Sequence, residues 1–235
     1  MKMCAKCFCL ANTEEEIAKN HNCENAEIVN IDDTIAPAIE RLNKKGWQTR
    51  FCCEGHEDGL HPAYVSFKYV KSRHIIFLMA LLPANIFDNF AVELNIQGTS
   101  ASQIIYENWA DIKIPKMVKE GSVEYIDGQI STMDLEYDKI TYHTSFEVKS
   151  TNDILTCMSS ELMMFDKSYC ITLRPKNEKE LLKAFDTNDE EFSFLFKRMN
   201  EEFNYKLHQL SLIIDDLNKF QQFSMNNVDL NKLHE

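Results

Sequence analysis

The chain has 235 residues, 44% of them hydrophobic, and a formal net charge of −12. A chain of this length and composition can bury a proper core and fold as one large domain or two small ones. The acidic balance argues against a protein that coats nucleic acid, because such binding needs clustered Lys and Arg to neutralise phosphates. It remains compatible with a nucleotide bound in a local basic pocket, or with a basic partner surface.

The sequence predicts no membrane segment and no disulfides. The longest apolar stretch, residues 74–87, contains Pro83 and falls short of the roughly 18 to 20 residues that cross a bilayer. The chain opens without the regions of a secretory leader, so its eight cysteines are expected in a reducing compartment as metal ligands or buried thiols. We therefore expect a cytoplasmic protein with no membrane partner. Many Lys, Asn, Ile and Glu with few Gly and Pro are typical of an AT-rich bacterial or phage coding sequence.

Three segments differ in character along the chain. Residues 1–30 are rich in cysteine and poor in core hydrophobes, with one short helix-like stretch, TEEEIAK. Residues 31–188 alternate predicted strands and helices, and residues 189–235 contain one long amphipathic pattern. We expect a small Cys-rich knuckle, a ligand-binding α+β domain and a C-terminal helix with a tail, in that order.

The second segment opens with a predicted helix in the stretch IDDTIAPAIERLNKKGW. Ile35, Ile39 and Leu42 recur at helical spacing, Pro37 suits the first turn, and Gly46 suits the position just past the end. The strands predicted after it are QTRFCC, AYVSFKYV, FAVELNIQG, GSVEYIDGQI, KITYHTSFEVKS and YCITLRP.

Helices and turns are predicted between these strands. A buried helix follows AYVSFKYV and ends at Pro83, and Asn177 is positioned to cap the helix NEKELLKAF. The dipeptide Asp127-Gly128 predicts a hairpin turn. Together the elements predict an α+β fold, with a mixed or antiparallel sheet and flanking helices.

The last predicted element runs from Asp189 to about Phe223. One of its apolar rows recurs every seven residues and consists of Phe196, Phe203, Leu210 and Leu217. Such a helix would span roughly 50 Å. Two interpretations stay open: the helix packs along its own sheet, or it also forms the seam of a homodimer through Phe203, Leu210 and Leu217.

The cysteine-rich start predicts a structural zinc site. Cys4 and Cys7 have the Cys-x-x-Cys spacing of a zinc half-site, and His21 and Cys23 can complete four ligands. A segment with so few hydrophobes would gain its order from the metal. Cys9 has no role in this scheme. The alternatives are a redox or unligated cysteine cluster, and a site completed by Cys52, Cys53 and His56 from the loop beyond the helix.

A turn after the strand QTRFCC is the predicted ligand site. Glycine permits a tight turn at position 55, and backbone N–H groups that converge beside His56 can hold an anionic oxygen. His61, Arg73 and His74 are nearby sources of further donors. The predicted ligand-binding residues are Thr49, Arg50, Cys53, Glu54, Gly55 and His56.

Three other interpretations of the turn stay open. Cys52 and Cys53 can be buried thiols with His56 as a loop cap, Cys and His can form a metal site, or Cys53 and His56 can act in nucleophilic catalysis.

Residues 31–67 resemble two groups of proteins. One comprises uncharacterised bacterial and phage proteins, in which a helix ending in LN-x-x-G leads to a T-x-x-C-x-GH turn. The other, more distant, is the tRNA wybutosine-synthesis methyltransferase family, which the resemblance links to S-adenosylmethionine and a tRNA base. In that family arginine stands at the place of His56, and two serines stand at the places of Arg50 and Phe51. The residues that anchor the resemblance are Leu42, Asn43, Thr49, Cys53, Gly55 and His56, the last of which matches the first group only.

Three functions follow as hypotheses. The first is a binding protein for a small anionic or nucleotide-like ligand at the Cys-x-Gly-His turn, such as a phage-type protein that sequesters a host signalling nucleotide. The second is an RNA-modification enzyme related to the methyltransferases. The third is an acidic inhibitor that contacts a host protein.

Overall fold

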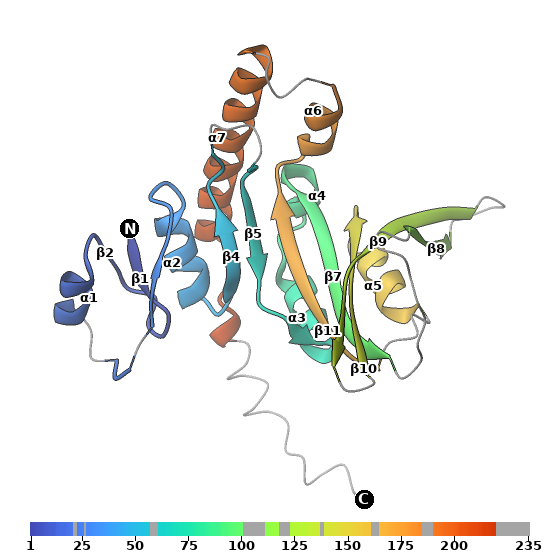
Figure 1. Cartoon of the computed structure of the whole chain (residues 1–235), viewed down its shortest axis with the longest axis horizontal. Helices are drawn as coiled ribbons and strands as arrows, with labels where there is room; N and C mark the ends of the chain where they lie inside the picture. The colour runs from blue at the N-terminus through green and yellow to red at the C-terminus, as the bar shows by residue number, and fades with distance from the viewer. Residues whose placement is uncertain are drawn as a thin grey trace, which may run out of the picture.

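A computed structural model of the chain gives the structure. It describes residues 1–20, 23–25, 27–56, 61–100, 111–117, 123–136, 139–160, 165–184 and 190–219. These residues form an α+β fold, as predicted, and it contains two sheets, both antiparallel. The smaller sheet belongs to the Cys-rich start and lies at one edge of the molecule, beside the larger sheet and its helices (Figure 1).

The N-terminal unit is a three-stranded sheet with one short helix. Its elements are β1 (Lys2–Cys4), β2 (Leu10–Ala11), α1 (Glu14–Asn20) and β3 (Ile28–Asn30), with strand order β2-β1-β3. Helix α1 begins with a capping box: Glu16 N–H donates to Thr13 Oγ1 at 3.2 Å, and Glu16 Oε2 accepts from Thr13 N–H at 3.4 Å. The polar stretch NTEEE thus begins the short helix that the stretch TEEEIAK predicted.

The larger sheet contains eight strands, all paired antiparallel. Its order is β4-β5-β11-β7-β10-β9-β8, and β6 also pairs with β11. The strands are β4 (Thr49–Cys53), β5 (Tyr64–Phe67), β6 (Val70–Lys71), β7 (Ala91–Ser100), β8 (Asp111–Met117), β9 (Val123–Glu136), β10 (Lys139–Val148) and β11 (Phe165–Arg174).

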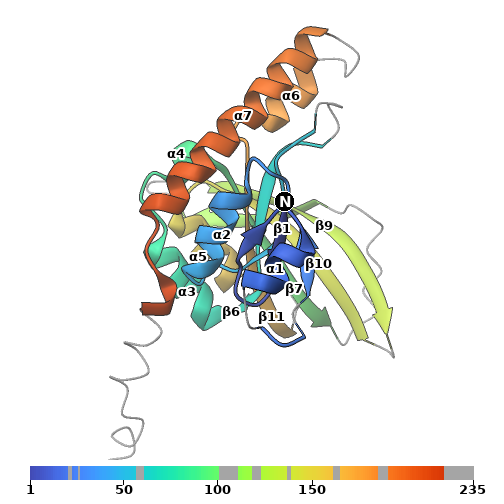
Figure 2. The same cartoon turned by 90° about the vertical axis from the view of Figure 1, so that its left-hand side faces the viewer.

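Helices cover one face of this sheet. They are α2 (Ala36–Lys44), α3 (Ser72–Leu81), α4 (Ile86–Asn89), α5 (Thr151–Ser159) and α7 (Glu190–Ile213), with α6 (Glu178–Ala184) beside α7. Figure 2 shows these helices on one side of the strands. In β7, Val92, Leu94 and Ile96 are buried against them, while the alternate residues Glu93 and Asn95 are half-buried on the other face. The period-2 pattern of the strand therefore separates a core face from a polar face.

The hairpin turn predicted at Asp127-Gly128 is wrong. Both residues lie within β9, where Gly128 pairs with Phe146 of β10. A Cβ at position 128 would meet the Phe146 ring at 2.2 Å. Glycine is present because a buried aromatic ring packs over the strand at this point, and no local signal distinguishes that requirement from a turn.

The C-terminal helix is shorter than predicted. Helix α7 has 24 residues and ends at Ile213, about 36 Å from its start. Lys45 beyond α2 donates its amine to the carbonyls of Ser211 and Ile214 at 3.0 and 2.7 Å. These contacts satisfy the end of the helix and turn the chain onto α2. Residues 220–223 of the predicted helix lie outside the described residues.

The heptad row predicted for the C-terminal helix belongs to the core of a single chain, although Leu217 lies beyond the end of α7. Phe203, Leu210 and Leu217 are 2%, 4% and 5% exposed within that chain. These side chains are therefore not available as the seam of a homodimer, and a dimer would need other residues. No helix in the described ranges has both the length and the apolar character that a membrane crossing requires.

Candidate functional site

Three thiols of the N-terminal unit converge on one point. The sulfur atoms of Cys4, Cys7 and Cys23 lie within 4.8 Å of one another, close enough to hold a metal ion. Cys4 is fully buried at the end of β1, and the other two thiols are half-buried. The fourth predicted ligand, His21, lies outside the described residues.

A tight turn brings the first two cysteines together. Phe8 N–H donates to Cys4 O at 2.9 Å, and Cys4 N–H donates to Cys9 O at 3.1 Å. Phe8 has φ +62°, the left-handed region that side chains other than glycine seldom occupy. Cys9 follows directly, and its sulfur lies 3.4 Å from that of Cys7.

The thiols influence one another's ionisation. Burial raises the pKa of Cys7, but hydrogen bonds from the Cys9 amide and from neighbouring thiols outweigh it and lower that pKa to about 7. Burial and the Cys7 sulfur raise the pKa of Cys9 to about 11. The hydrogen bond to Cys7, together with burial, raises the pKa of Cys23 to about 11. One thiol ionises first and resists ionisation of the others, which is the situation that a bound cation relieves.

The predicted turn begins at a link between α2 and β4. Asn43 is buried, and its Nδ2 donates to Ile39 O at 2.9 Å and to Thr49 Oγ1 at 3.0 Å. Its Oδ1 accepts from Thr49 N–H at 2.9 Å. Gly46, with φ +89°, lets the chain reverse between the helix and the strand. Thr49 therefore fastens β4 to α2 and does not face the turn.

Gly55 shapes the turn itself. Its φ is +88°, and a Cβ there would come within 2.3 Å of the Asn200 side chain on α7. Asn200 is buried, and its Oδ1 accepts from Ala63 N–H at 2.9 Å. Asn204, one helical turn later, donates from Nδ2 to Glu54 O at 2.9 Å. Two asparagines of α7 thus hold both sides of the turn, and only glycine fits beneath them.

The amides of the turn donate to groups of the protein. Glu54 N–H donates to the Asp32 carboxylate at 3.0 Å, Gly55 N–H to Cys53 Sγ at 3.3 Å, and His56 N–H to His61 O at 2.9 Å. Glu54 in turn accepts from Thr34 N–H at 2.9 Å. Recognition of a ligand in this geometry falls to side chains.

Cys53 and His56 are the side chains that face each other at the turn. Cys53 Sγ lies 3.5 Å from His56 Nε2, and the exposed His56 ring meets His61 edge-on at 5.6 Å between centroids. Burial, and then the charges of Asp32 and Glu54, raise the pKa of Cys53 despite the Gly55 amide. The thiol is therefore protonated at neutral pH, which does not favour a thiolate nucleophile.

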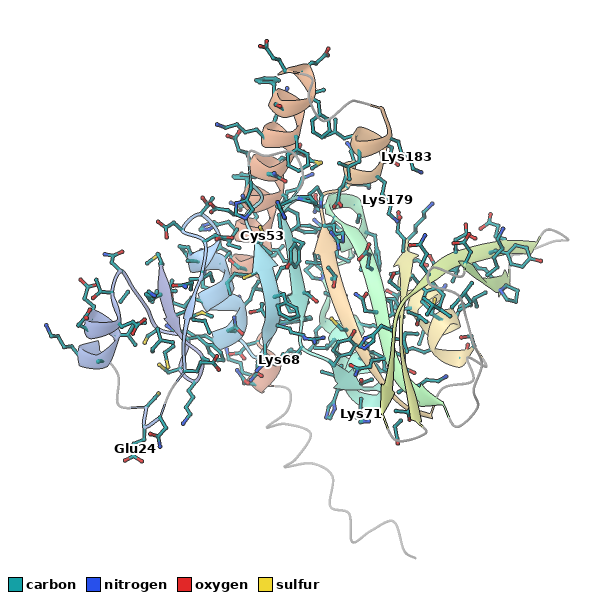
Figure 3. The ribbon with its side chains drawn as sticks, in the orientation of Figure 1. Glu24, Cys53, Lys68, Lys71, Lys179 and Lys183 are labelled. Carbon is teal, nitrogen blue, oxygen red and sulfur yellow. The ribbon has the colours of Figure 1, made fainter. Side chains whose placement is uncertain are left out.

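Tyr64 and Arg174 extend this corner across the sheet. Tyr64 pairs with Cys53 between β5 and β4, and the Arg174 guanidinium lies 5.6 Å from the Tyr64 ring centroid. Burial and the neighbouring thiols raise the pKa of Tyr64, so its phenol remains a hydrogen-bond donor. Glu93 binds Arg174 at 3.0 Å. Figure 3 shows Cys53 at the upper end of β4.

Other predicted residues lie elsewhere. The Arg50 guanidinium stacks on Phe51 at 4.8 Å and on Tyr69 at 5.2 Å, near the start of β4. Arg73 and His74 belong to α3, which follows the opposite end of the β4–β5 pair. Cys53 also lies far from Glu24, the neighbour of Cys23 (Figure 3). The thiol cluster and the turn are therefore separate places.

Asn200 and Asn204 are the site residues that the sequence interpretation missed. Their four-residue spacing on an otherwise apolar stripe of α7 was the available signal. Among the described residues, Asn204 Oδ1 is buried without a hydrogen-bond partner, so it can accept a further hydrogen bond. Two clefts of about 310 and 380 Å³ lie along another side of α7 and share Asn89, Glu202 and Lys206.

Comparison with protein families, curated proteins and solved structures gave no significant match. The geometry of the two sites therefore carries the functional argument.

Proposed function

We propose that the protein binds a small nucleotide-like ligand at the turn formed by residues 53–56, and that zinc orders its N-terminal unit. The ligand-binding proposal rests on a contrast among the residues that anchor the resemblance. Leu42, Asn43, Thr49 and Gly55 each have a packing or hydrogen-bonding role in the fold. The exposed His56 ring faces the Cys53 thiol at the surface instead, where a ligand can meet it.

The chemistry of the corner favours a ligand with both polar edges and an anionic group. The phenol of Tyr64 stays protonated and can donate a hydrogen bond to the edge of a base. His56, once protonated, offers a positive charge to a phosphate. The amides of the turn are engaged within the protein, so His56 is the residue on which anion recognition depends most.

The test is small-molecule analysis of the purified protein. We expect a nucleotide-like compound, released intact on heating and identified by mass spectrometry, to raise the melting temperature when it is added back. His56→Ala should abolish that rise while its own melting temperature stays near that of the wild type. Arg50→Ala is the matched control, because its guanidinium stacks on Phe51 and Tyr69.

Four outcomes would overturn or change this proposal. Retention of the rise by His56→Ala would move the site away from the turn. A released molecule that the protein has altered would assign an enzyme, such as the RNA-modification activity that the resemblance implies. Indifference to the whole nucleotide panel, with copurification of a host protein, would assign an inhibitor. A protein that releases nothing and responds to nothing would leave the turn a purely structural feature.

The zinc proposal rests on the convergence of Cys4, Cys7 and Cys23. Thiolates clustered in a small unit are the donor set that structural zinc prefers. Purification without chelators should yield about one zinc ion per chain. Cys4→Ser and Cys7→Ser should lose both the zinc and stability, because structural zinc contributes folding free energy. Metal-free protein of unchanged stability would refute this part.

A further inference from the structure

Three thiols leave a zinc site incomplete, because structural zinc takes four protein ligands. We infer that Cys9 is the fourth ligand, so that Cys4, Cys7, Cys9 and Cys23 form a four-thiolate site. This inference rests on the proposed zinc and assigns a role to a cysteine that the Cys-x-x-Cys and His-x-Cys pattern leaves unused.

The sulfur of Cys9 lies beside one member of the thiol cluster. Zinc–sulfur bonds of about 2.3 Å in a tetrahedron place sulfur atoms about 3.8 Å apart. Cys9 Sγ lies 3.4 Å from Cys7 Sγ. Cys4, Cys7 and Cys23 form the mutually close group, so binding one ion also requires the Cys9 sulfur to move toward those of Cys4 and Cys23.

The backbone explains how two cysteines in a Cys-x-Cys sequence reach one point. In an extended strand, residues two apart lie about 6.6 Å apart along the chain. Phe8 instead adopts φ +62° between them, and Cys4 N–H holds Cys9 O at 3.1 Å. This hydrogen bond closes the turn, so Cys9 is fixed beside Cys4 and Cys7.

Burial places all four cysteines in one cluster. Cys4 is buried with two apolar side chains, and the half-buried residues packed against this group are Cys7, Cys9, Cys23 and Ile28. A core this small gives little hydrophobic stabilisation, and small units of this kind are usually held by metal or disulfides. Cys9 therefore belongs to the group that needs a cross-link.

Hydrogen bonds also tie the two halves of the site together. The Lys6 amine donates to Glu24 O at 2.5 Å, and Ala5 N–H donates to Glu27 O at 2.9 Å. The turn that carries Cys4, Cys7 and Cys9 is thereby held against the segment that carries Cys23. Lys6 also brings a positive charge near a site that would carry a net charge of about −2 with four thiolates on Zn²⁺.

Cobalt substitution tests the fourth ligand, because the intensity of thiolate-to-cobalt charge transfer scales with the number of cobalt–sulfur bonds. The full chain is loaded with Co²⁺ as wild type, Cys9→Ser, Cys9→His and His21→Ala. We expect the Cys9→Ser intensity to fall to about three quarters of the wild-type value, with metal affinity lowered at least about tenfold. His21→Ala should keep the wild-type spectrum and affinity, and Cys53→Ser is the cysteine control.

Cys9→His keeps a metal ligand at position 9. It tests whether this position supplies the fourth ligand if Cys9→Ser does not fold. Its tetrahedral cobalt bands should remain but shift to shorter wavelength, as one sulfur is replaced by nitrogen. A wild-type spectrum typical of three sulfurs and one nitrogen, together with loss of affinity in His21→Ala, would overturn the assignment of Cys9. A wild type that takes up neither cobalt nor zinc would instead refute the zinc proposal itself.

Discussion

Replacement of Gly55 by alanine tests the close contact between α7 and the turn at residues 53–56. Gly55 has φ +88°, and an added Cβ would come within 2.3 Å of Asn200. An L-residue in a left-handed conformation costs about 1–2 kcal/mol. Displacement of Asn200 also breaks its 2.9 Å hydrogen bond with Ala63 N–H, and a buried amide left unpaired costs about 1–3 kcal/mol. We therefore expect Gly55→Ala to destabilise the protein by about 2–5 kcal/mol.

A double-mutant cycle separates these two contributions. Asn200→Ala removes the obstructing side chain, so adding Gly55→Ala to it should cost only the backbone strain, about 1–2 kcal/mol. The assay is urea denaturation followed by circular dichroism, with melting temperatures as a second measure. A shift of about 2–4 °C per kcal/mol is expected for a chain of this size.

Gly46→Ala is the matched control for the cycle. Gly46 has φ +89°, and an added Cβ would meet Asn218 at 2.9 Å. Gly46→Ala should therefore also destabilise the protein. Only Gly55→Ala should weaken ligand binding at the turn. If Gly55→Ala lowers the free energy of unfolding by the same amount in the wild type and in Asn200→Ala, α7 does not approach the turn closely and the reasoning fails.

Two further predictions concern the large sheet and its ion pair. Gly128→Ala should cost about 1–3 kcal/mol, because its Cβ would meet the Phe146 ring at 2.2 Å. Urea denaturation should show a smaller cost in a Phe146→Leu background, and an equal cost would contradict the packing argument. Burial raises the pKa of Asp153, but the Lys116 amine at 2.7 Å and two further hydrogen bonds outweigh it and lower that pKa. The contacts of the Asp153 carboxylate therefore stabilise the protein fully above the pKa of that carboxyl in the unfolded chain, near 3.9. This stabilisation is lost as pH falls through the lower pKa of the folded protein. Asp153→Asn should be less stable than the wild type at pH 7, and the difference should shrink as pH falls through the native pKa of Asp153. A stability difference that does not change with pH would contradict the assignment.

Local patterns predicted the elements around the turn well. The helix at Ile35, Ile39 and Leu42 and the strand that follows it need only side-chain periodicity and two end signals, Pro37 and Gly46. Such signals lie within a few residues of what they specify. The antiparallel sheet followed in the same way, because most of its strands alternate buried and half-buried residues.

Features that depend on contacts between distant residues could not be predicted from the sequence. Helix α7 ends where Lys45 binds its last carbonyls, and Gly128 lies beneath a ring from the neighbouring strand. Each contact joins positions whose proximity exists only in the folded chain. The same holds at the turn, where Asn200 and Asn204 come from the far end of the described chain. Cys9 is a different case. The Cys-x-Cys spacing is visible in the sequence, but the backbone turn that brings the two thiols together is not.

The clamp on the turn also fixes an order of events during synthesis. Glu54 and its partner Asn204 are 150 residues apart in the chain, so a ribosome adding roughly 5–20 residues per second leaves the turn without its clamp for roughly 8–30 s. During that interval the turn lacks its hydrogen bonds with Asn200 and Asn204 of α7. In the N-terminal unit, by contrast, the strand pairings join residues within positions 2–30 and can form early. A nascent chain would therefore complete the N-terminal sheet early and the turn at residues 53–56 late, so the ligand binding proposed for that turn would depend on near-complete translation.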